Sequence, residues 1–414
     1  MRVAIVGGGI SGLTAAHLLH RRHEIVLFEA AAQLGGHTHT VRVDTPNETH
    51  HVDTGFVVFN DRNYPSFESL LRELGVAWQP AEMSFSVSDE SGSFEYSSAS
   101  PGGLFAVRRH LISPAFYRMI ADLRRFHRRA RELLGRGDDH ISLREWLERE
   151  RFTRMFIDRL IVPQVSAVWS ADPQALWSFP ARFLAEFLAN HGMLGLRNRP
   201  RWRAINGGSS VYVAALSQSF AARVRLRARV RAVRRAEDHV LLEVDGQEPE
   251  RFDQVVLATH SDQALALLAD PSEREREILG AIPYQSNEVV LHTDVRLLPR
   301  RRGAWASWNY HLLAEPPART TITYHMNRLQ SLRAEREFCV TLNQTERIDP
   351  TKVIKRIEFA HPVYTTQGVR AQARLAEISG QRRTHFCGAW SGFGFHEDGV
   401  RSALRVAAAL GAHP

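Results

Sequence analysis

Apolar residues near the start of the chain fall into short runs that alternate between two periods. Residues 1–6 and 25–28 are almost continuously apolar, which is typical of strands buried on both faces. Between them, apolar side chains from Leu13 to Leu19 recur at helical spacing, and residues 64–74 repeat that spacing. A strand, a helix and a strand in this order predict a parallel α/β sheet.

The period then changes along the middle of the chain. Residues 83–87 and 93–96 alternate apolar and polar side chains around a polar turn, which predicts a hairpin. From residue 114 to about 195 the spacing is helical, and Ser142 with Glu145 forms a capping-box pattern. The aromatic residues of this block either form core or line an apolar tunnel: Trp169, Trp177, Phe179, Phe183 and Phe187. Further strand patterns follow at residues 289–292, 304–312, 320–326 and 338–342.

The parallel pattern returns twice after this helical block. Residues 224–233 and 240–244 are expected as strands, residues 255–258 as the last central parallel strand, and residues 384–410 as a strand with a helix from about Val400. A chain of 414 residues is too long for one simple core, so we expect two interlocked domains. The first is predicted from residues 1–75, 200–270 and 350–414, and the second from residues 76–199 and 271–349.

Three glycines follow the first strand with the spacing G-x-G-x-x-G and open the helix. Gly7 permits a tight turn, Gly9 lets a pyrophosphate approach the backbone, and Gly12 brings the helix close to its strand. Glu29 ends the second strand, where its carboxylate suits a hydrogen bond to an adenosine ribose hydroxyl. Free N–H groups and the helix dipole hold the phosphates at Gly9, Ile10 and Ser11. These features predict a dinucleotide site.

A second glycine pair, Gly35 and Gly36, follows Glu29 in the segment Glu-Ala-Ala-Ala-Gln-Leu-Gly-Gly-His-Thr. At these residues the sequence resembles the flavin-containing amine oxidase superfamily, whose members share an acid, a glycine pair and then Arg-x-x-Thr. The resemblance extends to Asp53-Thr-Gly55, Asn206-Gly-Gly-Ser209, residues 255–259 and the tail from Phe386 to Ala403. It implies non-covalent FAD in a two-domain α/β fold, with a Rossmann-type FAD domain and a mixed α+β substrate domain.

The resemblance also implies further cofactor contacts. His37 stands where the family has arginine, and Thr38 follows it. Backbone N–H groups near Gly399 and Val400 are expected to face the flavin pyrimidine ring. The other implied contacts are Val230, at a strand whose backbone meets adenine, and Gly388. Two family features have no counterpart: Ala389 replaces the acid that binds the ribityl chain, and no lysine occurs near residues 287–290.

Two residues are candidates for chemistry. Aligned on Gly399, His396 takes the place of one of the two aromatic rings that flank the amine in amine oxidases. A histidine there either transfers a proton near neutral pH or only hydrogen-bonds backbone in a crowded turn. Tyr364 is the candidate for the second ring. Glu397 and Asp398 are expected to cap the following helix.

Charge and composition limit the classes of partner and ligand that we expect. The net charge is +8, almost all cations are arginine, and the arginine clusters are scattered, so we expect no nucleic-acid partner. Two cysteines exclude a disulfide framework, and Cys387 is expected to be buried. The histidines His37, His39, His50 and His51 lack a carboxylate or cysteine framework, so no metal is expected. The sequence does not indicate the oligomeric state.

A basic protein attracts an acid or an anionic membrane better than a cationic amine. One branch of the superfamily desaturates or isomerises apolar chains. We therefore expect an FAD-dependent oxidoreductase that transfers hydride to flavin N5 from a small hydrophobic, fatty-acyl or lipid substrate. An amine or amino-acid oxidase and a flavoprotein with structural FAD remain alternatives. The expected location is cytoplasmic, with peripheral contact to the anionic surface of the inner membrane as an open alternative.

Overall fold

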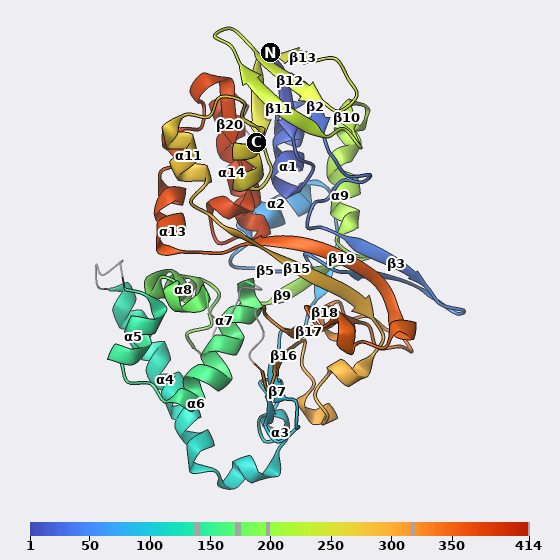
Figure 1. Ribbon diagram of the computed structural model, residues 1–414. Coiled ribbons are helices and arrows are strands. Elements are labelled where there is room, and N and C mark those ends of the chain that lie inside the picture. The colour runs from blue at the N-terminus through green and yellow to red at the C-terminus, as the bar shows by residue number, and fades with distance from the viewer. Residues whose placement is uncertain (136–140, 170–174, 196–198, 316–318, 413–414) are drawn as a thin grey trace.

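The computed structural model describes residues 1–135, 141–169, 175–195, 199–315 and 319–412. Its α/β fold has two parts, one above the other in Figure 1, and both chain ends lie in the upper part. Two long strands, β15 (Tyr284–His292) and β19 (Val353–Pro362), run between the parts. No helix in the described ranges combines the length and apolarity that a membrane crossing requires.

A five-stranded parallel sheet forms the centre of the upper part. Its order is β10 (Val224–Arg225), β2 (Glu24–Phe28), β1 (Arg2–Val6), β14 (Gln254–Leu257) and β20 (Thr384–Phe386). Val3 and Ile5 face a core shared with the helices α1 (Ile10–Leu19), α2 (Pro65–Glu73), α9 (Ser210–Ser217) and α14 (His396–Ala409). Ala4 and Val6 face a second core on the other side. Burial on both faces explains the continuous apolar runs of the strands.

The second core lies under a three-stranded antiparallel sheet and three helices. These elements are β11 (Val230–Arg235), β12 (Val240–Val244), β13 (Glu250–Phe252), α10 (Ser261–Leu267), α11 (Glu273–Leu279) and α13 (Thr366–Ala373). The single strand expected at residues 224–233 is wrong, because Arg227 has a φ of 53° and divides it into β10 and β11. The expected last central strand, β14, lies between β1 and β20.

The lower part is built on a seven-stranded sheet. Its order is β19, β15, β18 (Cys339–Leu342), β17 (Ile322–His325), β16 (Trp308–Leu312), β7 (Phe85–Asp89) and β8 (Glu95–Ser97). The hairpin of β7 and β8 and the four later strands confirm their sequence patterns. The domain boundary expected at residue 350 assigned β19 to the other domain, whereas β19 pairs with β15 along its length.

Helices cover this sheet on the left in Figure 1. They are α4 (Pro114–Leu134), α5 (Leu143–Arg149), α6 (Arg154–Phe156), α7 (Val162–Trp169) and α8 (Ala181–Asn190), whereas α3 (Pro101–Leu104) lies below β7. The expected capping box of Ser142 and Glu145 begins α5. The remaining elements are β3 (Thr40–Asp44), β4 (Thr49–Asp53), β5 (Val58–Asn60), β6 (Trp78–Pro80), β9 (Trp202–Ile205) and α12 (Met326–Leu329).

Candidate cofactor and substrate site

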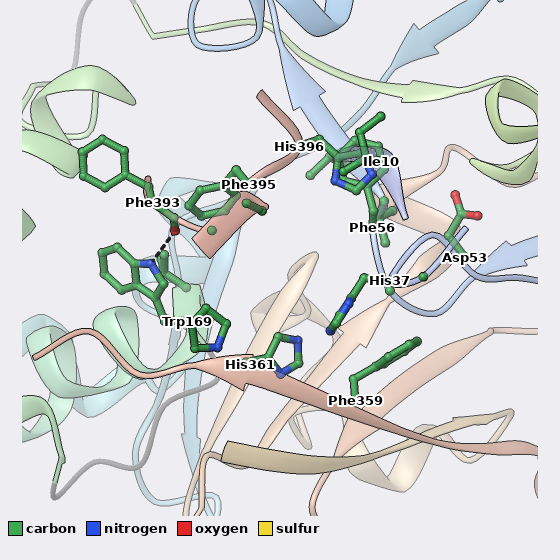
Figure 2. Close-up of a pocket in the computed structure, with 18 of the residues that line it drawn as sticks. Ile10, His37, Asp53, Phe56, Trp169, Phe359, His361, Phe393, Phe395 and His396 are labelled. Atoms are coloured by element: carbon green, nitrogen blue, oxygen red, sulfur yellow. Dashed lines mark hydrogen bonds between the residues drawn. The ribbon is translucent and has the colours of Figure 1, made fainter. Parts of the chain in front are cut away.

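A cavity of about 2400 Å³ runs from the start of α1 into the helices of the lower part. Most pockets for a single small molecule have volumes of roughly 300–1,000 Å³. The cavity therefore has room for a large cofactor and a substrate together. Figure 2 shows its centre, where residues from both parts of the fold meet.

The start of α1 forms one end of this cavity. Gly7 has a φ of +106°, and a Cβ there would lie 2.8 Å from the carbonyl oxygen of Ala258. A Cβ on Gly12 would lie 1.9 Å from the carbonyl oxygen of Gly7, so Gly12 permits close helix packing. Gly9 differs, because the nearest heavy atom to its Cβ position is the Gly36 Cα at 4.0 Å. Since no side chain caps the helix at Gly9, its first turn presents backbone N–H groups to an anion.

Glu29 holds the neighbouring loop. Its Oε2 accepts a hydrogen bond from the Gly8 N–H at 2.7 Å, and its Oε1 accepts one from the Ala31 N–H at 2.8 Å. Gly36, with a φ of +58°, brings the second glycine loop against Gly9. Glu29, Gly35, Gly36 and Val230 all line the cavity at this end. The backbone N–H groups at the start of α1, the Glu29 carboxylate and the space beside Gly9 together fit a diphosphate with an attached ribose.

His396 begins α14 and also lines the cavity. Its Nε2 lies 3.0 Å from the Thr38 Oγ1 and 2.9 Å from the Tyr212 hydroxyl, and those two hydroxyl oxygens are 2.6 Å apart. Its ring stacks on Phe56, with the ring centroids 3.5 Å apart. Burial, and secondarily the charge of His37, lower the pKa of His396 to about 3. The imidazole is therefore neutral at neutral pH.

Glu397 and Asp398, the two acids that follow His396, both accept hydrogen bonds from backbone N–H groups. Glu397 accepts hydrogen bonds from the Ser66 and Phe67 N–H groups at 3.2 and 2.9 Å. Asp398 Oδ2 accepts bonds from the N–H groups of Phe393 and Phe395 at 3.1 and 3.0 Å. These contacts fix the glycine-rich turn and place His396 at the end of a helix.

Gly399 and Val400 lie one turn inside α14, whereas the sequence placed the helix start near Val400. The Gly399 N–H donates to the Phe395 carbonyl at 3.1 Å, and a Cβ there would lie 2.8 Å from the Ile10 Cγ2. Gly399 therefore lets α14 pack against α1. The N–H groups at the open end of the helix belong to residues 396–398.

Three histidines from separate elements meet on another wall of the cavity. The His37 ring centroid lies 5.5 Å from that of His260 and 5.3 Å from that of His361. His37 also stacks on Phe359, and its Nε2 lies 3.0 Å from the Ala360 carbonyl oxygen. Burial is the first cause that lowers the pKa of His37 and His260 to about 4 and that of His361 to about 3. This wall is therefore polar and uncharged.

The cavity wall in the lower part is mostly apolar. Its side chains include Met83, Met119, Leu123, Val168, Met326 and Leu329. Aromatic rings also line the cavity: Trp169, Phe393 and Phe395 are labelled in Figure 2, and Phe187 stacks on Phe395 with the ring centroids 5.5 Å apart. The Trp169 Nε1 donates to the Phe393 carbonyl at 3.1 Å, which joins α7 to the carboxyl-terminal turn.

Charged residues on the wall are unevenly distributed. Three acids of the described chain line the cavity: Glu29, Asp53 and Glu358. Asp53 is fully buried and accepts hydrogen bonds from Ser209 N and Oγ and from Gln330 Nε2. Burial raises the pKa of Asp53 to about 7. The basic residues Arg124, His127, Arg199, Arg201 and Arg203 line the lower part and its rim, and Arg229 and Arg231 lie beside Val230 at the cofactor end.

The family described as flavin containing amine oxidoreductase matches residues 10–411 of this chain. The chain belongs to this family. Members of the family use FAD, and the protein is an FAD-dependent oxidoreductase. Comparison with curated protein sequences gives no match.

Solved structures share the fold of the whole chain. Cyclohexylamine oxidase from Brevibacterium oxydans IH-35A is 16% identical, with a TM-score of 0.71 over 99% of this chain and 98% of that one. Putrescine oxidase bound to putrescine is 16% identical, with a TM-score of 0.70 over 99% of each chain. The CLA-producing fatty acid isomerase from P. acnes is 15% identical, with a TM-score of 0.70 over 97% and 96%.

The expected cofactor residues of this flavin enzyme occupy different positions. Those on the cavity wall are Gly7, Gly9, Ile10, Ser11, Glu29, Gly35, Gly36, His37, Val230 and Gly388. Gly12, Thr38, Gly399 and Val400 lie behind the wall among the described residues. Cys387 is fully buried in the core beside the sheet.

Tyr364, the expected second flanking ring, lies behind the wall. It is 1% exposed, its ring centroid lies 5.2 Å from that of Phe183, and its hydroxyl has no partner among the described residues. The cavity presents Phe56 and His396 as one stacked pair instead.

Nothing in the sequence indicated that several of the wall residues lie close to one another. His260 follows a central strand and His361 lies near the end of β19, so only the fold brings them to the cofactor cavity, whereas Tyr212 of α9 lies behind the wall against His396. Arg124 and His127 did not stand out in the sequence, because the helix that contains them is rich in arginine. Their spacing of three residues did place both on one face of α4.

Proposed function

We propose that this FAD-dependent oxidoreductase acts on an apolar chain that carries an anionic head group, such as a fatty acid, and desaturates it or moves a double bond. When bound, the flavin supplies an acceptor for a hydride at N5. The observation that carries the proposal is the apolar cavity in the lower part, whose wall includes the exposed arginines Arg124, Arg199 and Arg201.

The shape and lining of the cavity support a long apolar substrate. The lower wall combines methionine, leucine, valine and aromatic side chains from α4, α7 and the seven-stranded sheet. Burial of each methylene group contributes roughly 0.8 kcal/mol, so binding strengthens with chain length. The aromatic rings lie beside the turn before His396, which would hold the reactive part of such a chain near the cofactor end.

The charges on the rim support an acidic head group. Arg124 and Arg199 are exposed, and neither forms an ion pair with a described residue. Burial, then the charge of Arg131 and then that of Arg199 lower the pKa of His127 to about 4. An ammonium group would meet repulsion at this rim, whereas a carboxylate would gain charge-assisted hydrogen bonds.

An amine is the second candidate substrate, and a specific observation favours it. Trp169, Phe187, Phe393 and Phe395 present several ring faces to the cavity, and such faces attract cations. The neutral imidazoles on the opposite wall would not repel an amine. The two candidates therefore differ in the head group that the cavity accepts.

His396 is our candidate for proton transfer in either reaction. Its Nε2 lies within hydrogen-bond distance of two hydroxyl groups, and its low pKa keeps the ring unprotonated at neutral pH, so the imidazole is a weak base that holds a transferred proton only briefly. The Tyr212 and Thr38 hydroxyls fix the ring orientation. A positioned base of this kind contributes roughly 10²–10⁴ to a rate.

Oleic acid and oleylamine test the proposal directly, because they share one C18 chain and differ only in the head group. The FAD-loaded protein is mixed anaerobically with each, flavin absorbance is followed, and the products are identified by mass spectrometry. We expect bleaching or a shifted double bond with the acid. Bleaching with the amine alone would support amine oxidation. An unchanged flavin and unchanged chains with both compounds would support a structural FAD.

A further inference from the structure

We propose that the amino-terminal end of α4 and the turn before it dock the protein onto a membrane that contains anionic lipids. The docking surface consists of Leu111, Ile112, Tyr117 and the exposed arginines around them. The proposal rests on the proposed function in one respect, since a lipid-derived substrate would enter the cavity from this surface.

Exposed apolar side chains are concentrated at this position. Leu111, Ile112 and Tyr117 are 51%, 84% and 48% exposed, and they are three of the seven large apolar residues that are exposed in the described chain. The turn Arg108–Ile112 links α3 to α4 at the bottom of Figure 1, at the end of the molecule opposite the parallel sheet. The Tyr117 hydroxyl donates to the Leu111 carbonyl at 3.0 Å, which fixes the apolar tip.

The charges around the tip complement an anionic surface. Residues 101–131 contain eight arginines and one acid, Asp122. Asp122 is buried and accepts hydrogen bonds from the Thr153 N–H and hydroxyl. Arg108 and Arg118 are exposed, and no described residue pairs with either. Each arginine near an anionic bilayer strengthens binding roughly fivefold.

The solvent face of α4 extends the docking surface with basic and small side chains. Tyr117, Arg118, Ala121, Arg124 and Arg128 are exposed at spacings of three and four, so they form one face. Small and basic side chains on this face allow close approach to lipid head groups. An acidic protein partner would also suit the arginines, but it does not explain the 84% exposure of Ile112.

The same helix leads from this surface into the cavity. Met119, Ile120, Leu123, Arg124 and His127 line the cavity, one to three turns after the apolar tip. Arg124 is both exposed and on the cavity wall, so the cavity reaches the surface along α4. A chain that leaves the bilayer beside the tip would therefore meet the apolar wall residues of α4 next to Arg124.

Vesicle flotation of the FAD-loaded protein, without any turnover, tests the docking surface. We expect binding to vesicles of phosphatidylcholine and phosphatidylglycerol in equal amounts, at least tenfold weaker binding to pure phosphatidylcholine, and weakening by salt. Ile112→Asp should reduce binding at least tenfold, and Arg118→Glu severalfold. Leu226→Asp and Arg21→Glu, at exposed positions in the upper part, should bind normally.

Three outcomes would overturn the proposal. One is no vesicle binding by the unaltered protein, and another is equal loss in the Leu226→Asp control. The third is a dimer in light scattering that Ile112→Asp dissociates, which would make the tip a contact between two copies. Because Ile112 is exposed, its variant should keep the unfolding temperature of the parent. Failure of the oleic acid assay would leave vesicle binding unchanged, so the two proposals fail separately.

Discussion

The imidazole Nε2 of His396 lies 2.9 Å from the hydroxyl oxygen of Tyr212. Tyr212 comes from α9 and His396 from the first turn of α14, so the contact joins two helices that pack on the same face of the parallel sheet. Both side chains are buried, and burial raises the pKa of Tyr212 while it lowers that of His396. The pair is therefore held neutral, with the ring orientation set by the hydroxyl.

Removal of the His396 imidazole should slow turnover without loss of the cofactor. We expect His396→Ala to lower the rate of anaerobic flavin reduction by roughly 10²–10⁴ with the substrate that bleaches the parent enzyme. Tyr212→Phe should have a smaller effect and should shift the pH profile of the rate, because it removes only the hydroxyl partner. Flavin content, measured by absorbance, should stay near that of the parent. Full turnover by His396→Ala with full flavin would show that the residue is structural.

Substitutions in the first glycine loop should separate effects on FAD binding from effects on folding. Gly9→Ala has space for a Cβ on the cavity side, so we expect a normally folded protein whose FAD affinity falls at least tenfold. Gly12→Ala would place a Cβ 1.9 Å from the Gly7 carbonyl oxygen and should lower the unfolding temperature or prevent folding. Gly303→Ala, which meets nothing within 4 Å, is the control. Titration with FAD and thermal unfolding of the apoprotein distinguish these effects. Unchanged FAD affinity in Gly9→Ala would contradict the assigned phosphate position.

Arg124 should determine the preference for an acidic head group. Arg124→Glu reverses the charge at the cavity rim, so we expect the KM for oleic acid to rise at least tenfold while kcat changes little. Arg128→Glu reverses a charge one turn later on the same helix, but Arg128 is not on the described cavity wall. Steady-state kinetics of both variants at low ionic strength provide the measurement. Equal effects of the two substitutions would indicate a general charge effect instead of a contact at the rim.

Local patterns predicted the secondary structure better than the walls of the site. Strands such as β1 and β14 are buried on both faces, so their apolar runs reveal them directly. The glycine loops were recognisable because a close approach of backbone permits no side chain at Gly7 or Gly12. The start of α14 was expected four residues too late, because hydrogen bonds from the turn to Asp398 replace an ordinary cap sequence.

Contacts between residues that are far apart in the sequence could not be predicted from local patterns. His37, His260 and His361 belong to a loop, a strand end and a long strand of the other part. Their contact depends on how β19 crosses between the two parts. Tyr364 was chosen by its distance from the tail in sequence, and that distance does not determine which way its ring points. The structure turns the ring toward Phe183 and the helical core.

Acid should destabilise the protein through its buried histidines. Burial lowers the pKa of eight histidines to about 4 or 3 in the folded chain: His37, His127, His191, His260, His292, His311, His361 and His396. The unfolded chain, with histidine pKa values near 6.5, binds more protons between about pH 6.5 and 4, so the free energy of unfolding falls as the pH falls through this window.

The raised pKa values of Asp53 and Asp398, about 7 and 6, act in the opposite direction, because these carboxyl groups take up protons more readily in the folded state. Two carboxyl groups do not offset eight imidazoles, so we expect the unfolding temperature to fall by ~5–10 °C between pH 7 and pH 5. Thermal unfolding across this range measures the effect, and His361→Gln should make the dependence shallower because it removes one group that titrates only after unfolding. An unfolding temperature that stays constant or rises on acidification would mean that water in the cavity already solvates these imidazoles in the folded protein.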